Sequence, residues 1–216
     1  MTRNLPPTAS FAEATTGAKL HAPSAARNGG PIADLLTRCA PGTGRALEIA
    51  SGTGQHVILF ADRLPGLDWQ PTDPDSARRA SIDAHAAEAE VPNIRPALHL
   101  DACSPGWNDA HAGQDLIVLC NLLHLVSWPE AQTLISEAAL ALAPGGTLVI
   151  YGPFKRDGQL TSDGDQRFDA ELRGADPQIG YKDDTQVAEA LARAGLSLAE
   201  MVDMPANNLA LVATRT

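Results

Sequence analysis

A short glycine loop is the first feature of the chain that could bind a ligand. Gly52 and Gly54 directly follow the apolar run 45–51, and the next residues have a helical pattern. Glycine accepts positive φ and lets a ligand approach the backbone, and the first N–H groups of the following helix can donate to it. Glu48, just before the loop, disfavours a pyrophosphate and favours a cation such as an ammonium or sulfonium. The alternative is a simple tight turn.

Acidic residues follow the next two apolar runs. Asp73 comes after Gly54 at about the 20-residue spacing at which an acid reaches the ribose hydroxyls in nucleotide-binding βαβ units. Asp101 ends the run 94–100 and precedes the small residue Ala102. The alternatives are an Asx turn before a proline and a solvated acid in a loop. The spacing of Asp73 from the loop favours a ligand with ribose hydroxyls.

Residues after two later apolar runs could act on a bound molecule. Asn121 offers both a donor and an acceptor, and His124 stands where a general base would be useful near neutral pH. The alternative for His124 is an imidazole packed in the core. Tyr151 and Lys155 begin a cluster of ionisable groups, in which Lys155 and Arg156 could hold an anionic substrate group. The alternative there is a solvated loop.

These residues need a sheet that brings strand ends together. Apolar runs alternate with helical patterns, and the last two runs read as a hairpin. The expected strands are 45–51, 68–72, 94–100, 115–121, 147–151, 197–204 and 209–214; the expected helices are 55–63, 76–90, 129–143 and 185–194. A polar insertion covers 153–182. The pattern predicts an α/β sandwich with a mostly parallel sheet, which binds ligands beyond the carboxyl ends of its strands.

Composition limits the partners. The 216 residues suit one medium domain, and 16 Lys and Arg against 26 Asp and Glu give a net charge of −10. Such a chain lacks the positive charge that holds nucleic acid, and an anionic membrane surface would repel it. A small-molecule site remains open. The composition gives no prediction of the oligomeric state.

Three further features bear on location and on metal binding. The longest apolar run, 116–125, is well short of the ~20 residues of a membrane span, and no secretion signal is evident. Cys39, Cys103 and Cys120 are scattered and predict free thiols, so we expect a cytoplasmic protein. His56 and His124 have no partner at ligand spacing, so no metal site is expected.

Several strings together resemble a known family. Glu-Ile-Ala-Ser-Gly-Thr-Gly, residues 48–54, resembles the first motif of class I S-adenosylmethionine-dependent methyltransferases, Glu-x-Gly-x-Gly-x-Gly, with Ala50 replacing its first glycine. More narrowly, the chain from Arg27 onward resembles the family grouped as domain of unknown function 938, related to animal methyltransferase-like 26 proteins. The strings that carry this resemblance are 27–28, 47–56, 69–75, 151–158 and 204–209.

The resemblance implies a fold and a cofactor, and it joins the residues at the strand ends into one set of expected site residues. The fold is a Rossmann-like three-layer sandwich with a seven-stranded, mostly parallel sheet and an antiparallel last strand. The cofactor is S-adenosylmethionine, with Asp101 accepting a hydrogen bond from the adenine amino group. The expected cofactor-binding residues are Arg27, Asn28, Glu48, Gly52, Gly54, His56, Asp73, Asp101, Ala102 and Asn121. The expected catalytic residues are His124, Tyr151 and Lys155.

The resulting hypothesis is direct methyl displacement onto an unidentified small molecule. Residues 1–26, rich in Ala, Thr and Pro, are expected to form a flexible tail or a lid, and 27–216 the methyltransferase domain. One alternative is a nucleotide-dependent oxidoreductase, which Glu48 and the valine at the third glycine position, Val57, disfavour. The other is a non-catalytic module that binds S-adenosylmethionine.

Overall fold

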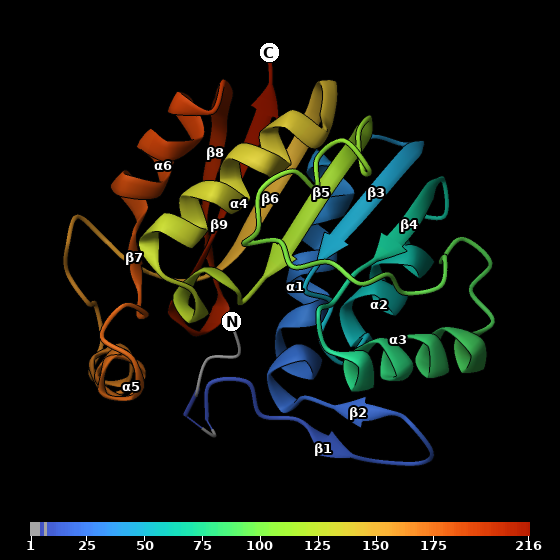
Figure 1. The fold of residues 1–216 in the computed structure, drawn as a ribbon, viewed down its shortest axis with the longest axis horizontal. Helices are drawn as coiled ribbons and strands as arrows, with labels where there is room; N and C mark the ends of the chain where they lie inside the picture. Colours follow the sequence, from blue (N-terminus) through green and yellow to red (C-terminus); the bar gives the residue numbers. More distant parts are fainter. Residues whose placement is uncertain (1–4, 7) are drawn as a thin grey trace.

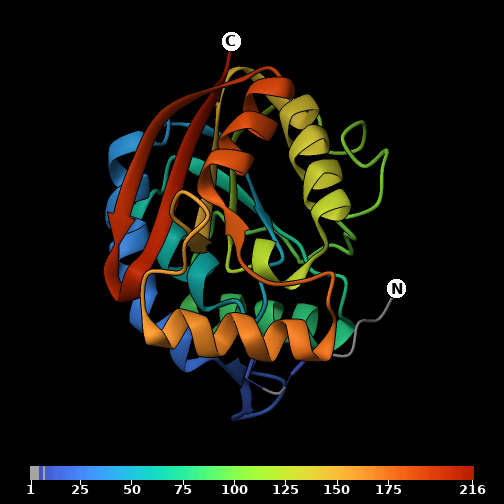
Figure 2. The same ribbon diagram turned by 90° about the vertical axis from the view of Figure 1, so that its left-hand side faces the viewer.

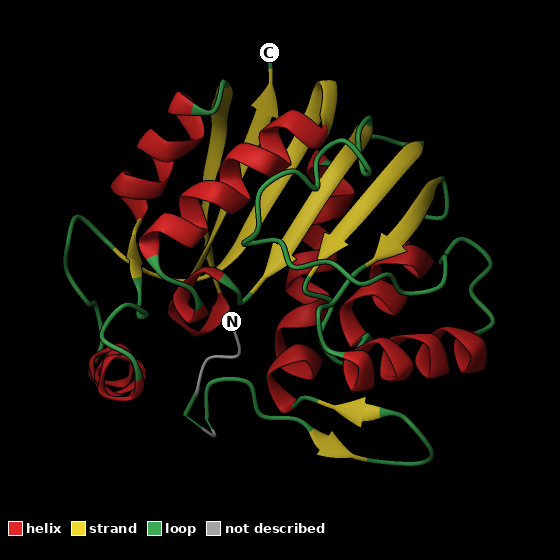
Figure 3. Cartoon of the chain, in the orientation of Figure 1, coloured by secondary structure: helices red, strands yellow, loops and turns green. Residues whose placement is uncertain are grey.

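One sheet of seven strands lies between two layers of helices (Figures 1 and 3). The computed structural model describes residues 5, 6 and 8–216. The path of the sheet is β4-β3-β5-β6-β9-β8, with β7 pairing to β6. The strands are β3 (Gly44–Ile49), β4 (Leu67–Pro71), β5 (Gln114–Cys120), β6 (Leu142–Lys155), β7 (Lys182–Asp183), β8 (Leu196–Met204) and β9 (Asn208–Arg215).

The strand directions confirm the expected fold class. β3 pairs in parallel with β4 and with β5, and β5 with β6. β9 runs antiparallel to both β6 and β8. The carboxyl ends of the parallel strands therefore meet at one edge of the sheet, where a ligand is expected.

Alternating side chains of the central strands bury against different helices. Leu47 and Ile117 belong to the core under α4 (Trp128–Ala141) and α6 (Asp184–Arg193). Ala46 and Leu116 belong to the opposite core, under α1 (Pro23–Cys39), α2 (Gln55–Arg63) and α3 (Ser76–Ala89). A strand buried on both faces is a nearly continuous apolar run, which is why these strands could be recognised in the sequence.

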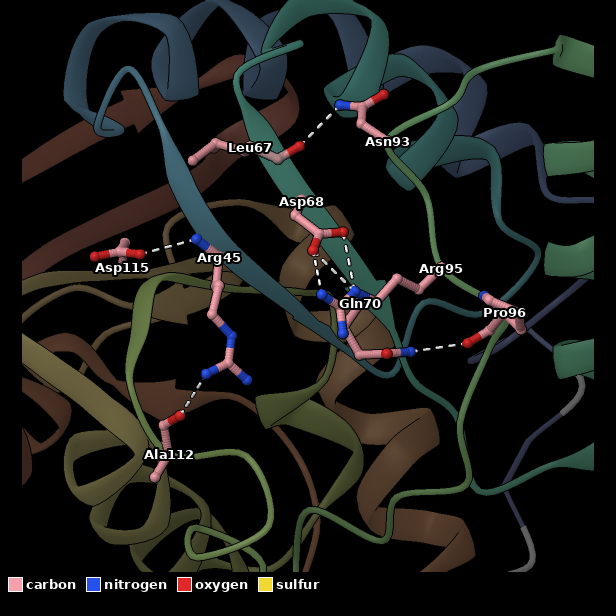
Figure 4. Close-up of polar contacts among 9 residues, drawn as sticks. All are labelled: Arg45, Leu67, Asp68, Gln70, Asn93, Arg95, Pro96, Ala112 and Asp115. Carbon is pink, nitrogen blue, oxygen red and sulfur yellow. Dashed lines mark hydrogen bonds and ion pairs between the residues drawn. The ribbon is translucent and has the colours of Figure 1, made fainter.

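The strand expected at 94–100 is not a strand. The segment runs beside β4 but forms only the isolated bridges Trp69–Ile94 and Thr72–Leu98. Backbone hydrogen bonds join the segment to β4 at both ends, but in the middle the Ala97 N–H donates to Asp83 Oδ1 at 2.8 Å instead of to β4. Figure 4 shows Arg95 paired with Asp68, and the Gln70 amide donating to the Pro96 carbonyl at 2.9 Å. The sheet reaches seven strands through β7, which was not predicted.

The N-terminal region contains more structure than expected. β1 (Glu13–Ala14) and β2 (Leu20–His21) form a hairpin, and α1 starts at Pro23, so the boundary expected at 26/27 falls inside a helix. The hairpin lies against α3, where the Leu20 N–H donates to Ser81 Oγ at 2.8 Å. Residues 1–4 and 7 of the expected tail lie outside the described residues.

The polar insertion forms a helix across the ligand edge of the sheet. α5 (Asp163–Ala175) is capped by Ser162, whose Oγ accepts from the Asp165 N–H at 3.1 Å. Figure 2 shows α5 lying crosswise to the strands, below their ends. α5 thus lies on the opposite side of this edge from α3. Across residues 5–6 and 8–216, no helix has the length and apolar character needed to span a membrane.

Candidate functional site

A cavity of about 1180 Å³ lies at the carboxyl ends of the parallel strands. Most of the residues expected to form the site line it: Arg27, Asn28, Gly52, His56, Asp73, Asp101, Ala102, Asn121, His124 and Tyr151. Glu48, Gly54 and Lys155 are not among the lining residues. The structure therefore brings together side chains that lie far apart in the sequence.

The glycine loop and Asp73 form one hydrogen-bonded unit. The Gly52 N–H donates to Asp73 Oδ2 at 3.0 Å, and the Asp75 N–H donates to Asp73 Oδ1 at 2.9 Å. Asp73 is buried, and burial raises the pKa of its carboxyl. Two backbone donors fix the orientation of the carboxyl group, while its other lone pairs can accept from ligand hydroxyls.

The two loop glycines have different surroundings. At Gly52, with φ of +60°, a β-carbon would meet the flexible Arg78 side chain, 3.2 Å from Nη1. At Gly54, with φ of +92°, a β-carbon would lie 2.8 Å from the Ile82 Cα. Gly54 therefore permits close packing of the loop on α3, whereas Gly52 is on the cavity wall.

Two other strand ends carry backbone strain. Ala50 has φ of +54° and Asn121 has φ of +56°, both in the left-handed region. Both residues line the cavity. For residues other than glycine this conformation costs roughly 1–2 kcal/mol, and such strain is concentrated at functional sites.

Glu48 lies buried below the loop. Its side chain is 1 % exposed, and its Oε2 has no hydrogen-bond partner among the described residues. Burial raises the pKa of this carboxyl to about 7. Such a group can ionise when positive charge is placed nearby.

His56 orients the start of α1 relative to α2. Its Nε2 lies 2.7 Å from Asn28 Oδ1, so Nε2 carries the proton if that oxygen accepts. Burial lowers the pKa of His56 to about 4 and keeps the imidazole neutral. Arg27 precedes Asn28 and lines the same part of the cavity.

The Asp101 carboxylate accepts hydrogen bonds from the loop that follows it. Its Oδ1 accepts from the Cys103 N–H and its Oδ2 from Ser104 Oγ, both at 3.1 Å. Ala102 between them is buried. A small apolar residue next to a partly exposed carboxylate suits a flat, polar-edged ring.

The opposite end of the cavity is aromatic. The rings of His124, Phe168 and Tyr181 meet edge to face, with centroids 5.7 Å apart for His124–Phe168, 6.2 Å for His124–Tyr181 and 6.1 Å for Phe168–Tyr181. We call these three rings the aromatic wall. Burial and the nearby Lys182 charge lower the pKa of His124 to about 3, so its imidazole is neutral.

The remaining expected residues lie around β6. Tyr151 is 1 % exposed and burial raises its pKa to about 12. Lys155 pairs in register with Asp183 of β7, beyond the cavity. The Arg156 guanidinium lies 3.6 Å from Asp203 and donates to the Asn208 carbonyl at 3.2 Å. Neither cation lines the cavity.

An N-terminal segment, residues 5, 6 and 8–11, crosses the cavity. Ser10 receives hydrogen bonds from Arg78 Nη2, at 3.2 Å to its carbonyl and 2.7 Å to its Oγ. Thr8 Oγ1 donates to Glu171 of α5 at 2.9 Å. The segment thus spans from α3 to α5.

Sequence reasoning missed Arg78, Phe168 and Tyr181, whereas the N-terminal segment belongs to the residues expected to form a tail or a lid. One signal was present: a protein with only four Phe and two Tyr places two of the Phe and one of the Tyr in the polar insertion 153–182. Within residues 5–6 and 8–216, no group of three or more His, Cys, Asp or Glu side chains could hold a metal ion.

Known proteins share part of this sequence and its fold. A trans-aconitate 2-methyltransferase of Variovorax paradoxus is 32% identical over 128 residues, which is 59% of this chain and 46% of the relative. An O-methyltransferase family protein from Burkholderia thailandensis superposes with a TM-score of 0.73 at 18% identity, over 87% of this chain and 56% of its own.

CalO1, a methyltransferase in calicheamicin biosynthesis, superposes with a TM-score of 0.70 at 17% identity, over 89% of this chain and 54% of its own. This chain therefore has the fold of these methyltransferases and spans about half the length of the relatives it matches. The model of a family described as protein of unknown function (DUF938) matches residues 19–215. The chain belongs to the DUF938 family.

Proposed function

We propose that this protein is a methyltransferase that uses S-adenosylmethionine and acts on a small molecule. The observation that carries the proposal is the hydrogen-bonded unit of Asp73 and the glycine loop on the wall of a large cavity beyond the sheet. The fold shared with known methyltransferases supports it.

The residues present fit this cofactor. Gly52 leaves the backbone open to the cavity, and the buried Glu48 has an oxygen without a partner among the described residues, beneath the place for a positive charge. In this proposal Asp73 accepts from the ribose hydroxyls, Asp101 accepts from the adenine amino group, and Arg27 and Asn28 bind the amino-acid end. When bound, S-adenosylmethionine supplies a methyl group on a positively charged sulfur.

The proposed roles of the other residues follow from their burial. His124 and Tyr151 line the cavity and would contact the methyl acceptor. With a pKa near 3, a neutral His124 takes a proton poorly and would act mainly by orienting the acceptor. Catalysis would rest on alignment of the reacting atoms. Lys155, outside the cavity, would act only through its neighbours on β6 and β7.

The N-terminal segment is proposed to be a lid. Its contacts to Arg78 and Glu171 hold it across the cavity, and releasing them would open a path for exchange of ligands. We further propose a cytoplasmic location, because Cys39, Cys103 and Cys120 are free thiols. The net charge of −10 argues against nucleic acid as the acceptor.

The experiment that tests the function is turnover with a metabolite extract. The protein is incubated with S-adenosylmethionine and a small-molecule extract, and formation of S-adenosylhomocysteine is measured. Turnover that depends on the extract and is lost in Asp73→Ala is expected. Cofactor binding without turnover in extracts of several organisms would favour the non-catalytic module, and reduction of a nicotinamide cofactor would favour the oxidoreductase.

The relative's substrate is a separate question. The Variovorax relative is named for trans-aconitate, which carries several negative charges. Such an acceptor needs cations on the part of the cavity where it binds. The positions of the cations that line the cavity therefore decide whether an acceptor with several negative charges would be bound.

A further inference from the structure

The aromatic wall is mostly ring carbon, and its one unpartnered polar atom among the described residues is the buried Nδ1 of His124. The Tyr181 hydroxyl donates to Asp165 at 3.1 Å, and the Tyr181 N–H donates to Asp169 at 2.6 Å. The backbone carbonyl of His124 accepts from the Gly180 N–H at 3.0 Å. These three groups are therefore satisfied within the protein, so the surface that Phe168 and Tyr181 offer to a molecule in the cavity is mostly ring carbon.

Aliphatic side chains extend the wall. Leu5, Ala9, Leu125 and Leu160 pack against the cluster that contains Tyr181, and the half-buried Phe168 packs there as well. Three of these aliphatic residues, Leu5, Ala9 and Leu125, also line the cavity. This end of the cavity is therefore apolar on the sides formed by α5, by the 3₁₀ turn Leu123–Leu125 and by the N-terminal segment.

The positively charged side chains that line the cavity lie at its other end, whereas Lys182, near His124, is outside the lining and donates to the Val126 and Gly180 carbonyls. Among the described lining residues, the Lys and Arg side chains are Arg27 and Arg78 alone. Arg27 adjoins Asn28, which binds His56 at the start of α2, and Arg78 lies against Gly52. Both cations thus belong to the glycine-loop end. A carboxylate at the aromatic wall would lose its hydration without gaining an ion pair, which is unfavourable.

Among the described lining residues, the carboxylate on the wall's side of the cavity is that of Glu130, and it is engaged. Glu130 Oε2 accepts from the Ser127 N–H at 2.7 Å and from Ser127 Oγ at 2.6 Å, closing a capping box at the start of α4. It therefore serves the helix end rather than a cationic acceptor. Among the described lining residues, the wall therefore offers a bound molecule neither a Lys or Arg side chain nor a carboxylate outside the capping box.

We propose that the methyl acceptor is an uncharged, largely apolar molecule with a flat ring, held against the aromatic wall, and that Phe168 sets this specificity. The inference rests on the proposed function, because it assigns the glycine-loop end to the cofactor. Aromatic rings at these distances favour edge-to-face or offset contacts with another ring. Phe168 is the wall residue supplied by α5, and it is the most exposed of the three rings.

The test measures, by calorimetry, how tightly matched probes bind to the intact protein saturated with S-adenosylhomocysteine. The probes are 2-naphthol, which is uncharged; 2-naphthoate, which adds a carboxylate to the same ring; cyclohexanol, which lacks the flat ring; and citrate. We expect 2-naphthol to bind at least about tenfold more tightly than each of the others.

Variants of α5 locate the binding. Phe168→Ala is expected to weaken 2-naphthol binding by about five- to tenfold, and Phe168→Leu by less, because leucine keeps apolar bulk without the ring. Arg167→Ala, an exposed neighbour on the same helix, is the matched control and should bind 2-naphthol as the parent does. Phe168→Leu also guards against loss of folding in the alanine variant.

Two results would overturn the inference: 2-naphthoate or citrate binding as tightly as 2-naphthol, or unchanged 2-naphthol binding in both Phe168 variants. Affinity for S-adenosylhomocysteine is measured on every variant and should not change. If the parent protein fails to bind S-adenosylhomocysteine, the proposed function fails. If that binding is intact and only the probe order is wrong, the acceptor class fails while the function stands.

Discussion

The two ends of the cavity are built in opposite ways. At the glycine-loop end, backbone N–H groups hold Asp73 in place and a buried acid, Glu48, lies below. At the other end, the rings of Phe168 and Tyr181 come from an insertion and pack on His124. The first end is polar and fixed by the local chain, and the second is apolar and fixed by tertiary packing. A change that affects one end should therefore spare the other.

The largest expected effect concerns stability rather than binding. Gly54→Ala should lower the free energy of unfolding by roughly 2–4 kcal/mol, because it combines left-handed strain with an overpacked contact to the α3 backbone. Chemical denaturation measures this. Gly52→Ala, which meets only the end of Arg78, is the matched control and should lose less stability but more cofactor affinity. Equal losses of stability in the two variants would remove the distinction between the glycines.

The buried Glu48 should make stability depend on pH. Its pKa is about 7 in the folded protein against an ordinary value of 4.5, so the unfolded chain ionises first as the pH rises. The stability that Glu48 contributes is therefore full below pH 4.5 and lost as the pH rises through 7, a change on the order of 3 kcal/mol.

Urea unfolding at pH 5 and at pH 8 tests this. Glu48→Gln should lose less stability between the two pH values than the parent protein, whereas the exposed Glu189→Gln should behave like the parent. Identical pH dependence in the parent and Glu48→Gln would contradict the expected ionisation. The burial-raised pKa of Asp73 acts in the same direction and remains in both proteins.

Asp73→Ala should damage cofactor binding and leave the aromatic wall intact. Loss of a charged acceptor for the ribose and for the Gly52 N–H is expected to weaken S-adenosylhomocysteine binding by about 10- to 100-fold. Asp68→Ala is the control, since this acid on β4 pairs with Arg95 outside the cavity. If both variants bind the ligand equally well, Asp73 is not a ribose-binding residue.

The smallest expected effect concerns the N-terminal segment. Arg78→Ala removes the hydrogen bonds to Ser10, worth about 1 kcal/mol, so hydrogen exchange in residues 8–11 should become roughly fivefold faster. Arg63→Ala, which removes an exposed ion pair with Asp34, should leave this exchange unchanged. Unaltered exchange in the Arg78 variant would show that its contact does not hold the segment.

The glycine-loop end could be predicted from sequence because its parts are local. Asp73 follows Gly54 by a spacing that the strand–helix–strand geometry imposes, and the buried strands are continuous apolar runs. Pattern alone placed a strand at 94–100, where the Ala97 N–H donates to the Asp83 side chain and only isolated bridges to β4 form.

The aromatic end could not be predicted in the same way. Phe168 and Tyr181 lie 44 and 57 residues beyond His124 along the chain. They meet it only because α5 folds back across the sheet edge, and no spacing rule specifies that path. Similarly, the N-terminal segment is held in position by the hydrogen bond from Arg78 of α3 to Ser10, which no local pattern indicates. Gly54 was expected in the binding site because the motif includes it, although its close contact with Ile82 is a packing requirement.

The central claim is that the glycine-loop end binds S-adenosylmethionine, and calorimetry on the intact protein tests it most directly. S-adenosylmethionine and S-adenosylhomocysteine should each bind at a single site, while NADH and NADPH should give no heat of binding. Absence of binding by both sulfur compounds, or a tight complex with a reduced nicotinamide cofactor, would contradict the account.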